Sequence, residues 1–209
     1  MKIDGYKPVL EEYPSELKTC TLTSIIDFLD ADIDSWRESG YLHVSHPNVV
    51  SLISNIYGDF NQRVNKISAI AITTDFRFGS NYDIESFIIA VNSQFKPSEN
   101  RDYLLSLVSS LTAESSQNIT DNGVSQKVIA KAGITMKQEV EIKNPIKLQP
   151  YRTFTEIEQP ESEFVFRISN NRGFECSLHP CDGAAWKLEA IQSIKAFFKK
   201  ELKNIPIIA

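Results

Sequence analysis

Residues 163–179 read EFVFRISNNRGFECSLH and predict the best-defined supersecondary unit of the chain. Glu163–Ile168 and Phe174–His179 both alternate between apolar and polar side chains, as strands with one buried face do. The residues between them, Asn170–Gly173, are rich in the types that form tight turns. We therefore predict an antiparallel β-hairpin over this stretch.

Helical patterns lie on both sides of this hairpin. Residues 83–95 and 98–112 carry apolar side chains at positions i, i+3, i+4 and i+7, which indicates two helices separated by Pro97. Ser98 offers a cap for the second helix, and we expect the pair to pack as a helical hairpin against one sheet. Residues 183–203 show the same spacing and predict a C-terminal helix.

The first part of the chain predicts a shorter helix and two strands. The helix follows a cap at Thr23 or Ser24 and ends before Gly40. Residues 41–45 alternate as a strand does, and residues 63–73 hold a second apolar, β-branched run.

The order of elements is that of an α+β protein. We predict a largely antiparallel sheet covered on one face by the helix pair and the C-terminal helix, because hairpin turns outnumber βαβ units. The helical spacing places Phe87 and Ile194 in the core. Residues 1–17 contain two prolines and no sustained periodicity, so we interpret them as an irregular N-terminal arm. The rest, residues 18–209, is predicted to form a single α+β domain.

Composition excludes several classes of protein. The 209 residues are 42% hydrophobic and carry a net charge of −5, which is ordinary for a globular protein and gives no global reason to bind nucleic-acid phosphates. The apolar runs are too short for a membrane span, and the start of the chain lacks the apolar core of a secretory signal. The sequence has three cysteines, an odd number that does not indicate a set of structural disulfide bonds. We expect a cytoplasmic protein without membrane or nucleic-acid partners.

The residues Cys176, His179 and Cys181 resemble a metal cluster, because thiolates and imidazoles are zinc ligands. They are one ligand short of a structural zinc site, and strand alternation places Cys176 and His179 on opposite faces. We interpret Cys176 as a small core residue. No phosphate-loop or dinucleotide glycine motif occurs in the sequence. We therefore expect no metal, no cofactor and no catalytic residue.

The densest polar stretch is residues 150–162, which read PYRTFTEIEQPES. An extended backbone would project Arg152, Phe154, Glu156 and Glu158 to one side. A cation beside two carboxylates is typical of ligand-binding surfaces and of acid–base chemistry. The competing interpretation is an edge strand whose charges prevent aggregation. The sequence leaves both interpretations open.

This stretch continues to Arg167 as PYRTFTEIEQPESEFVFR, and two further segments accompany it, DNGVSQK at 121–127 and DGAAW at 182–186. Together they resemble a family of uncharacterised proteins from phages and prophages of Gram-positive bacteria, and more loosely the YfdQ-like prophage proteins. The resemblance runs from about Thr19 to the end and departs at Ala184, where the family pattern has a second glycine. It implies a phage-derived protein made in the bacterial cytoplasm, and it carries over no activity.

From the residues and the resemblance we expect a non-enzymatic, homo-oligomeric binding protein that serves a phage by sequestering a small nucleotide signal of host defence. Sequestration needs a polar pocket and no catalytic set. The arginine fork matches a phosphate, and an aromatic ring can stack on a base. The predicted ligand-binding residues are Tyr151, Arg152, Glu156, Glu158, Arg167 and Trp186.

Two other functions stay open. An accessory factor of phage DNA replication or recombination would contact phosphates through a strip of lysines, namely Lys127, Lys131, Lys137, Lys143 and Lys147. A hydrolase would use Glu156 or Glu158 with His179 as base and acid. Self-association is expected in each case, because three apolar-striped helices and the tail Ile205–Ile208 exceed what one sheet readily covers.

Overall fold

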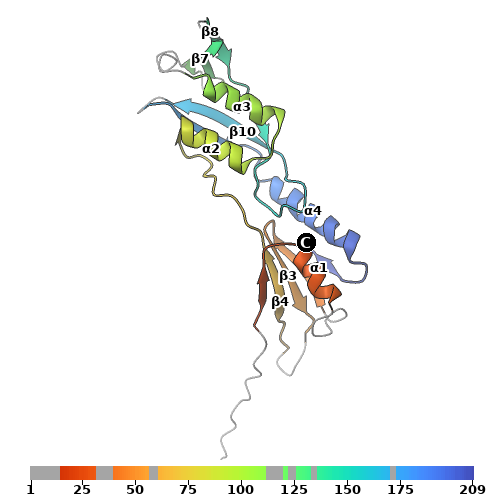
Figure 1. The fold of residues 1–209 in the computed structure, drawn as a ribbon. Coiled ribbons are helices and arrows are strands. Elements are labelled where there is room, and N and C mark those ends of the chain that lie inside the picture. Colours follow the sequence, from red (N-terminus) through yellow and green to blue (C-terminus); the bar gives the residue numbers. More distant parts are fainter. Residues whose placement is uncertain are drawn as a thin grey trace, which may run out of the picture.

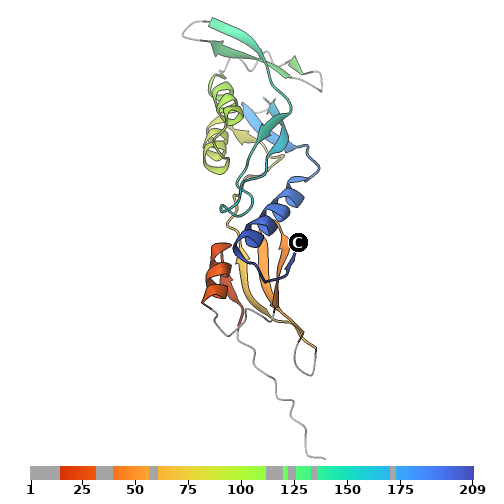
Figure 2. The ribbon, with the colours of Figure 1, turned by 90° about the vertical axis from the view of Figure 1, so that its right-hand side faces the viewer.

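The computed structural model describes residues 15–31, 40–56, 61–111, 120–121, 126–132, 136–169 and 173–209. They form an elongated molecule in which three small sheets follow one another along the long axis (Figures 1 and 2). Two of the sheets each belong to a hydrophobic core of their own. We call these two parts the five-stranded lobe and the four-stranded lobe.

The five-stranded lobe holds a sheet of order β1-β4-β3-β2-β12 and two helices. Its elements are β1 (Leu17–Thr19), α1 (Thr23–Asp30), β2 (Gly40–His46), β3 (Val49–Ser54), β4 (Asn65–Ile70), α4 (Trp186–Glu201) and β12 (Ile207–Ile208). The central strands pair antiparallel, whereas the edge strands β1 and β12 pair in parallel. The C-terminal tail is therefore an edge strand of the chain's own sheet.

Both helices of this lobe bury their apolar stripes in one core. Ile25 and Leu29 of α1 and Ile194 and Phe198 of α4 are buried with apolar side chains of β2, β3 and β4. Phe154, which arrives from a distant loop, completes the same core. The predicted burial of Ile194 is confirmed.

The start of α1 differs from the sequence-based expectation. The helix begins at Thr23, and the residue at its N-cap position, Leu22, makes no capping bond. Instead, Glu156 Oε1 accepts hydrogen bonds from the Thr23 N–H and hydroxyl groups, at 3.0 and 3.1 Å. The predicted cap at Thr23 or Ser24 is wrong, because a carboxylate 133 residues away caps the helix and lies at the positive end of its dipole.

The four-stranded lobe holds the predicted hairpin and helix pair. Its elements are β5 (Tyr82–Asp83), α2 (Ile84–Gln94), α3 (Glu99–Ser109), β9 (Ile146–Leu148), β10 (Ser162–Ser169) and β11 (Glu175–Pro180). The strand order is β5-β11-β10-β9, and every pair is antiparallel. β10 and β11 form the hairpin expected from the sequence, although residues 170–172 of its turn lie outside the described part.

The helices α2 and α3 pack against each other and against β11 and β9. Asp83 caps α2 by accepting a hydrogen bond from Ser86 N–H at 2.9 Å, and Ser98 caps α3 by accepting from Arg101 N–H at 3.2 Å. Phe87 is fully buried between helix and sheet. The predicted helical hairpin, the cap at Ser98 and the burial of Phe87 are confirmed.

A third sheet projects from the far end of the four-stranded lobe (Figure 2). It consists of β6 (Thr120–Asp121), β7 (Gln126–Ala132) and β8 (Met136–Glu141), all antiparallel. Gln126 bonds through its side-chain amide to both backbone groups of Ile168, at 3.0 and 3.2 Å. Asn144 does the same for Phe166, at 2.8 and 3.0 Å. The two amides thus satisfy the edge of β10 beyond the end of β9.

The α+β class and the largely antiparallel pairing are confirmed. The helices are, however, divided between two sheets, with α2 and α3 on the four-stranded sheet and α4 on the five-stranded one. Helical periodicity shows which side of a helix is buried, but it does not show which sheet packs against that side. The single domain over residues 18–209 stays a prediction. Of the predicted N-terminal arm, residues 1–17, the first 14 residues lie outside the described part of the chain.

Candidate functional site

The polar stretch that the sequence singles out crosses between the two lobes. We call residues 150–161 the strap; it follows β9 and leads into β10. The Tyr151 N–H group donates to Gln94 O at the end of α2, at 2.9 Å. Farther along, Thr153 Oγ1 donates to Pro47 O in the turn between β2 and β3. The strap is therefore bonded to both lobes.

The strap contains a turn organised by a buried glutamine. The Ile157 N–H group donates to Phe154 O at 3.4 Å, and Gln159 is only 4% exposed. Gln159 Oε1 accepts from the N–H groups of Arg152 and Thr153, at 3.1 and 3.4 Å. Its Nε2 donates to Phe154 O at 2.9 Å. The same nitrogen donates to Ile157 O at 3.5 Å, so one side chain bonds to four backbone groups and fixes the position of Arg152.

Arg152 is held at the junction by Trp186 and by Ser162, which is in turn bonded to Asp182; we call these four residues the clasp. Its guanidinium lies over the ring of Trp186, with 4.1 Å between Arg152 Cζ and the ring centre. Arg152 Nη2 donates to Ser162 Oγ, which donates to Asp182 Oδ2. Burial lowers the pKa of Arg152 to about 10, although the carboxylates of Asp182 and Glu189 act to raise it. The side chain is therefore still a cation at neutral pH.

The turn before α4 sets the position of Trp186. Gly183 and Ala184 both have left-handed φ angles, 59° and 64°, and Asp182 Oδ1 accepts from Ala184 N–H at 3.1 Å. The helix expected from Gly183 begins only at Trp186, because left-handed residues interrupt right-handed helical geometry. Ala184 thus has a conformation that glycine adopts without strain and alanine does not.

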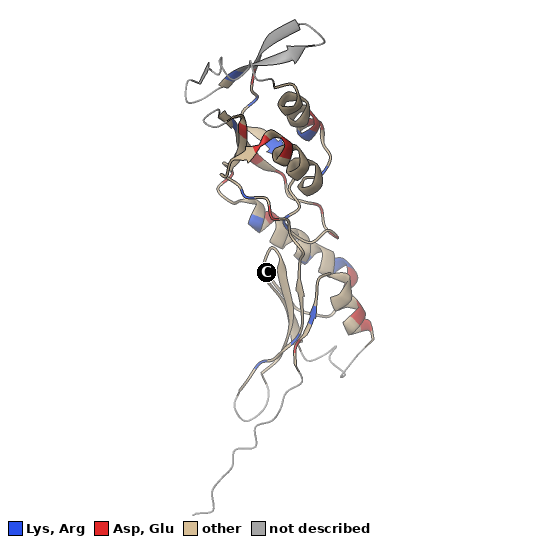
Figure 3. Ribbon diagram, turned by 60° about the vertical axis from the view of Figure 1, so that its left-hand side comes forward, with Lys and Arg blue, Asp and Glu red and all other residues tan. Residues whose placement is uncertain are grey.

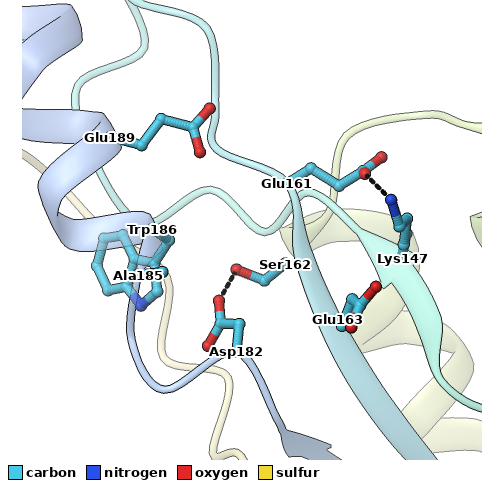
Figure 4. Close-up of a pocket in the computed structure, with 8 residues that line it drawn as sticks. All are labelled: Lys147, Glu161, Ser162, Glu163, Asp182, Ala185, Trp186 and Glu189. Carbon is cyan, nitrogen blue, oxygen red and sulfur yellow. Dashed lines mark hydrogen bonds and ion pairs between the residues drawn. The ribbon is translucent and has the colours of Figure 1, made fainter.

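A pocket of about 160 Å³ lies beside the clasp, between β10 and the first turn of α4 (Figure 4). We call it the junction pocket. It is lined by Lys147, Glu161, Ser162, Glu163, Asp182, Ala185, Trp186 and Glu189. Lys147 pairs with Glu161 at 3.5 Å, whereas Glu163 and Glu189 make no ion pair with any described residue. With four carboxylates and one ammonium group, the lining is net negative.

The structure brings together two of the six residues predicted to bind a ligand. Arg152 and Trp186 are in direct contact. Arg167 lies on β10 opposite Ser177 of β11. The backbone N–H and C=O groups of Tyr151 form hydrogen bonds that hold the strap in place. Of the six, Trp186 lines the junction pocket, whereas Arg152, Arg167 and Tyr151 do not.

The two glutamates of the predicted set serve the architecture. Glu156 caps α1, and Glu158 accepts a hydrogen bond from Lys96 Nζ, which lowers the pKa of that carboxyl. The expectation that these glutamates project together with Arg152 and Phe154 is wrong, because the turn at residues 154–157 interrupts the alternation of an extended strand. Phe154 is instead buried in the core of the five-stranded lobe.

The face assignments around Cys176 are as the sequence indicates. Cys176 is fully buried, and burial raises the pKa of its thiol to about 12. His179 is exposed on the opposite face, where its Nε2 lies 3.1 Å from Ser177 Oγ. Neither Glu156 nor Glu158 is bonded to His179. In the described part of the chain, no three His, Cys, Asp or Glu side chains are placed to hold one metal ion.

Sequence reasoning missed Ser162 and Asp182, which link Arg152 to the start of α4, and the acidic lining of Glu163 and Glu189. Asp182 does belong to the DGAAW segment noted in the sequence. Its partnership with Ser162 depends on how the end of β11 lies beside the start of β10, and no local pattern encodes that.

Comparison of the chain with protein-family models, curated proteins and solved structures finds no match. None of the helices in the described ranges combines the length and the apolar character needed to cross a membrane. The function is therefore argued from the geometry of the junction itself.

Proposed function

We propose that this chain is a non-enzymatic binding protein and that the junction pocket is its ligand site. One observation carries the proposal: the ring of Trp186, which lines the pocket, already holds a guanidinium, that of Arg152, and the carboxylates of Asp182 and Glu189 favour the charged form of that guanidinium. These groups supply the two attractions that an organic cation needs, an aromatic face and nearby negative charge.

The charge of the pocket selects the class of ligand. Four carboxylates and one ammonium group face the cavity, which gives a formal charge of 1 − 4 = −3 for its lining. Opposite charges a few ångströms apart attract more strongly at a partly desolvated site than in bulk water. We propose that the ligand presents an ammonium or guanidinium group, either on a free polyamine or on a lysine or arginine of a protein.

The nucleotide signal expected from the sequence stays a second candidate. The contact between Arg152 and Trp186 supports it, because these groups were expected to hold a phosphate and a base. Two features oppose it. The guanidinium covers one face of the ring on which a base would stack, and the acidic lining repels phosphates.

A phage origin, a bacterial cytoplasmic location and self-association remain further proposals. The apolar tail Ile205–Ile208 gives less support to a homo-oligomer than the sequence suggests. It ends in β12, which pairs with β2 of the same chain. The lysine strip of the DNA-accessory alternative is not favoured, because Lys147 is paired with Glu161 and Lys143 lies over the ring of Tyr103. In the part of the ribbon that Figure 3 colours, acidic and basic residues are interspersed, which does not favour a phosphate-binding face. Native mass spectrometry of the purified protein tests subunit number and retained small molecules together.

Isothermal titration calorimetry tests the ligand class. The probes are spermidine and an acetylated arginine amide as cations, and a cyclic dinucleotide and ADP-ribose as anions, each at low and high ionic strength. We expect saturable binding of the cations that weakens as salt is added, because screening reduces the attraction of the carboxylates. Binding of the nucleotides alone would reverse the assignment.

A matched pair of variants separates the pocket from general charge effects. Glu189→Gln removes a carboxylate from the pocket and from the first turn of α4, and Glu85→Gln removes one from the first turn of α2. Both lower the net negative charge by one. We expect Glu189→Gln to weaken spermidine binding several-fold and Glu85→Gln to leave it unchanged. Equal affinities in the two variants would mean that the cation binds elsewhere.

A further inference from the structure

The cation position of the junction is filled by the chain itself. Arg152 places its guanidinium 4.1 Å from the centre of the Trp186 ring, within the range of a close cation–π contact. Asp182 and Glu189, which line the junction pocket, are the charges that favour the protonated form of Arg152. The groups proposed to attract a ligand therefore attract Arg152 in its absence.

The hold on Arg152 is incomplete. Its Nη2 donates to the hydroxyl of Ser162 rather than forming a two-pronged bond with a carboxylate. Its Nε is buried and has no hydrogen-bond partner among the described residues. A buried donor without a partner loses its hydration and gains nothing in return, whereas a guanidinium in water satisfies all five donors. Leaving the ring therefore costs Arg152 less than leaving a bidentate carboxylate pair would.

We infer that Arg152 is an intramolecular competitor that occupies the Trp186 ring until a cationic ligand displaces it. The inference rests on the proposed function and adds its regulation. The affinity measured for a ligand is the intrinsic affinity reduced by the fraction of molecules in which Arg152 leaves the ring free. Removal of the arginine should then strengthen binding. If Arg152 instead contacted the ligand directly, as it would contact the phosphate of a nucleotide, its removal would weaken binding.

The test measures spermidine affinity in Arg152→Gln and Arg152→Lys, by the fluorescence of Trp186 in a Trp36→Phe background that leaves one tryptophan. We expect Arg152→Gln to bind spermidine at least about fivefold more tightly than the parent, as expected if Arg152 covers the ring in most molecules. Arg152→Lys retains a competing cation and should stay closer to the parent. An arginine-containing peptide titrated in parallel distinguishes a protein side chain from a free polyamine as the better ligand.

A second variant covers the case in which Arg152→Gln fails to fold, as judged by circular dichroism. Ser162→Ala removes the one hydrogen bond seen for the guanidinium and keeps the arginine, so it should tighten spermidine binding in the same direction by a smaller factor. If the parent binds spermidine and the variants bind it equally or more weakly, the competition is refuted and the proposed function stands. If neither the parent nor the variants bind either cation, the proposed function fails as well.

Discussion

The two lobes are assembled in different ways. The four-stranded lobe is antiparallel throughout, and its helices carry their own side-chain caps, Asp83 and Ser98. The five-stranded lobe takes its parts from far away: both edge strands pair in parallel, Phe154 of the strap enters its core, and Glu156 caps its first helix. The helices of one lobe are thus capped by adjacent residues, whereas the core and the first helix of the other depend on the strap.

The largest expected effect comes from removing a buried ring on either side of this comparison. Phe154→Ala and Phe87→Ala each truncate a phenylalanine that is at most 1% exposed, and each should lower the free energy of unfolding by about 3–5 kcal/mol. Hydrogen exchange separates the two. Phe154→Ala should speed exchange in α1 and β2–β4, and Phe87→Ala in α2 and α3. Uniform loss of protection in both variants would mean that the lobes unfold as one unit.

A backbone contact inside the five-stranded lobe gives the next largest effect. A Cβ atom on Gly40 would lie 2.4 Å from Ile53 O, a backbone atom of β3 that cannot rotate away. Gly40→Ala should therefore cost about 1–3 kcal/mol of unfolding free energy, as overpacking does. Urea denaturation measures it, with Ser45→Ala at an exposed position of β2 as the control. A midpoint shared by both variants would contradict the close approach.

Helix caps compare local with remote support more finely. Ser98→Ala removes a cap that lies next to its helix, and Glu156→Ala removes one supplied by the strap. Each should cost about 1 kcal/mol of unfolding free energy. Only Glu156→Ala should also speed hydrogen exchange in the strap, because only there does the cap join two distant segments. If hydrogen exchange in both α1 and the strap is unchanged in Glu156→Ala, then Glu156 does not cap the helix.

The same difference explains how far the sequence could predict the fold. The β10–β11 hairpin and the helix pair follow from alternation, helical spacing and turn residues that lie within a few positions of each other. β3 (Val49–Ser54) was not expected, because four of its six residues are buried and blur the alternation. β12 has two residues and a parallel partner, and such pairing leaves no local pattern.

The candidate site was predictable only in part for the same reason. The polar stretch and the resemblance predict Arg152 and Trp186 in one site, and the two side chains are in contact. Glu156 and Glu158 were misplaced, because the turn around Gln159 depends on a side chain that satisfies the backbone of the strap. Tertiary contacts of this kind produce no periodic pattern in the sequence from which they could be predicted.

The smallest expected effect lies at the junction of the lobes. Ala184 has a left-handed φ of 64°, which costs an alanine roughly 1 kcal/mol and a glycine nothing. Ala184→Gly should raise the free energy of unfolding by less than about 1 kcal/mol, because the greater freedom of glycine in the unfolded chain offsets part of the relief. A thermal melt with Ala185→Gly as the control measures it. A lower melting temperature for Ala184→Gly would show that the turn is not strained.

The most direct test of the account follows the Trp186 indole N–H signal in a ¹H–¹⁵N spectrum during a spermidine titration, with Trp36→Phe used to assign it. The account predicts that this signal shifts in a saturable way together with the backbone amides of Ser162 and Asp182, which line the junction pocket. The amide of Ser86, in the four-stranded lobe at the start of α2, should stay in place. Shifts confined to residues outside the pocket, or an unmoved Trp186 signal at saturating spermidine, would contradict it.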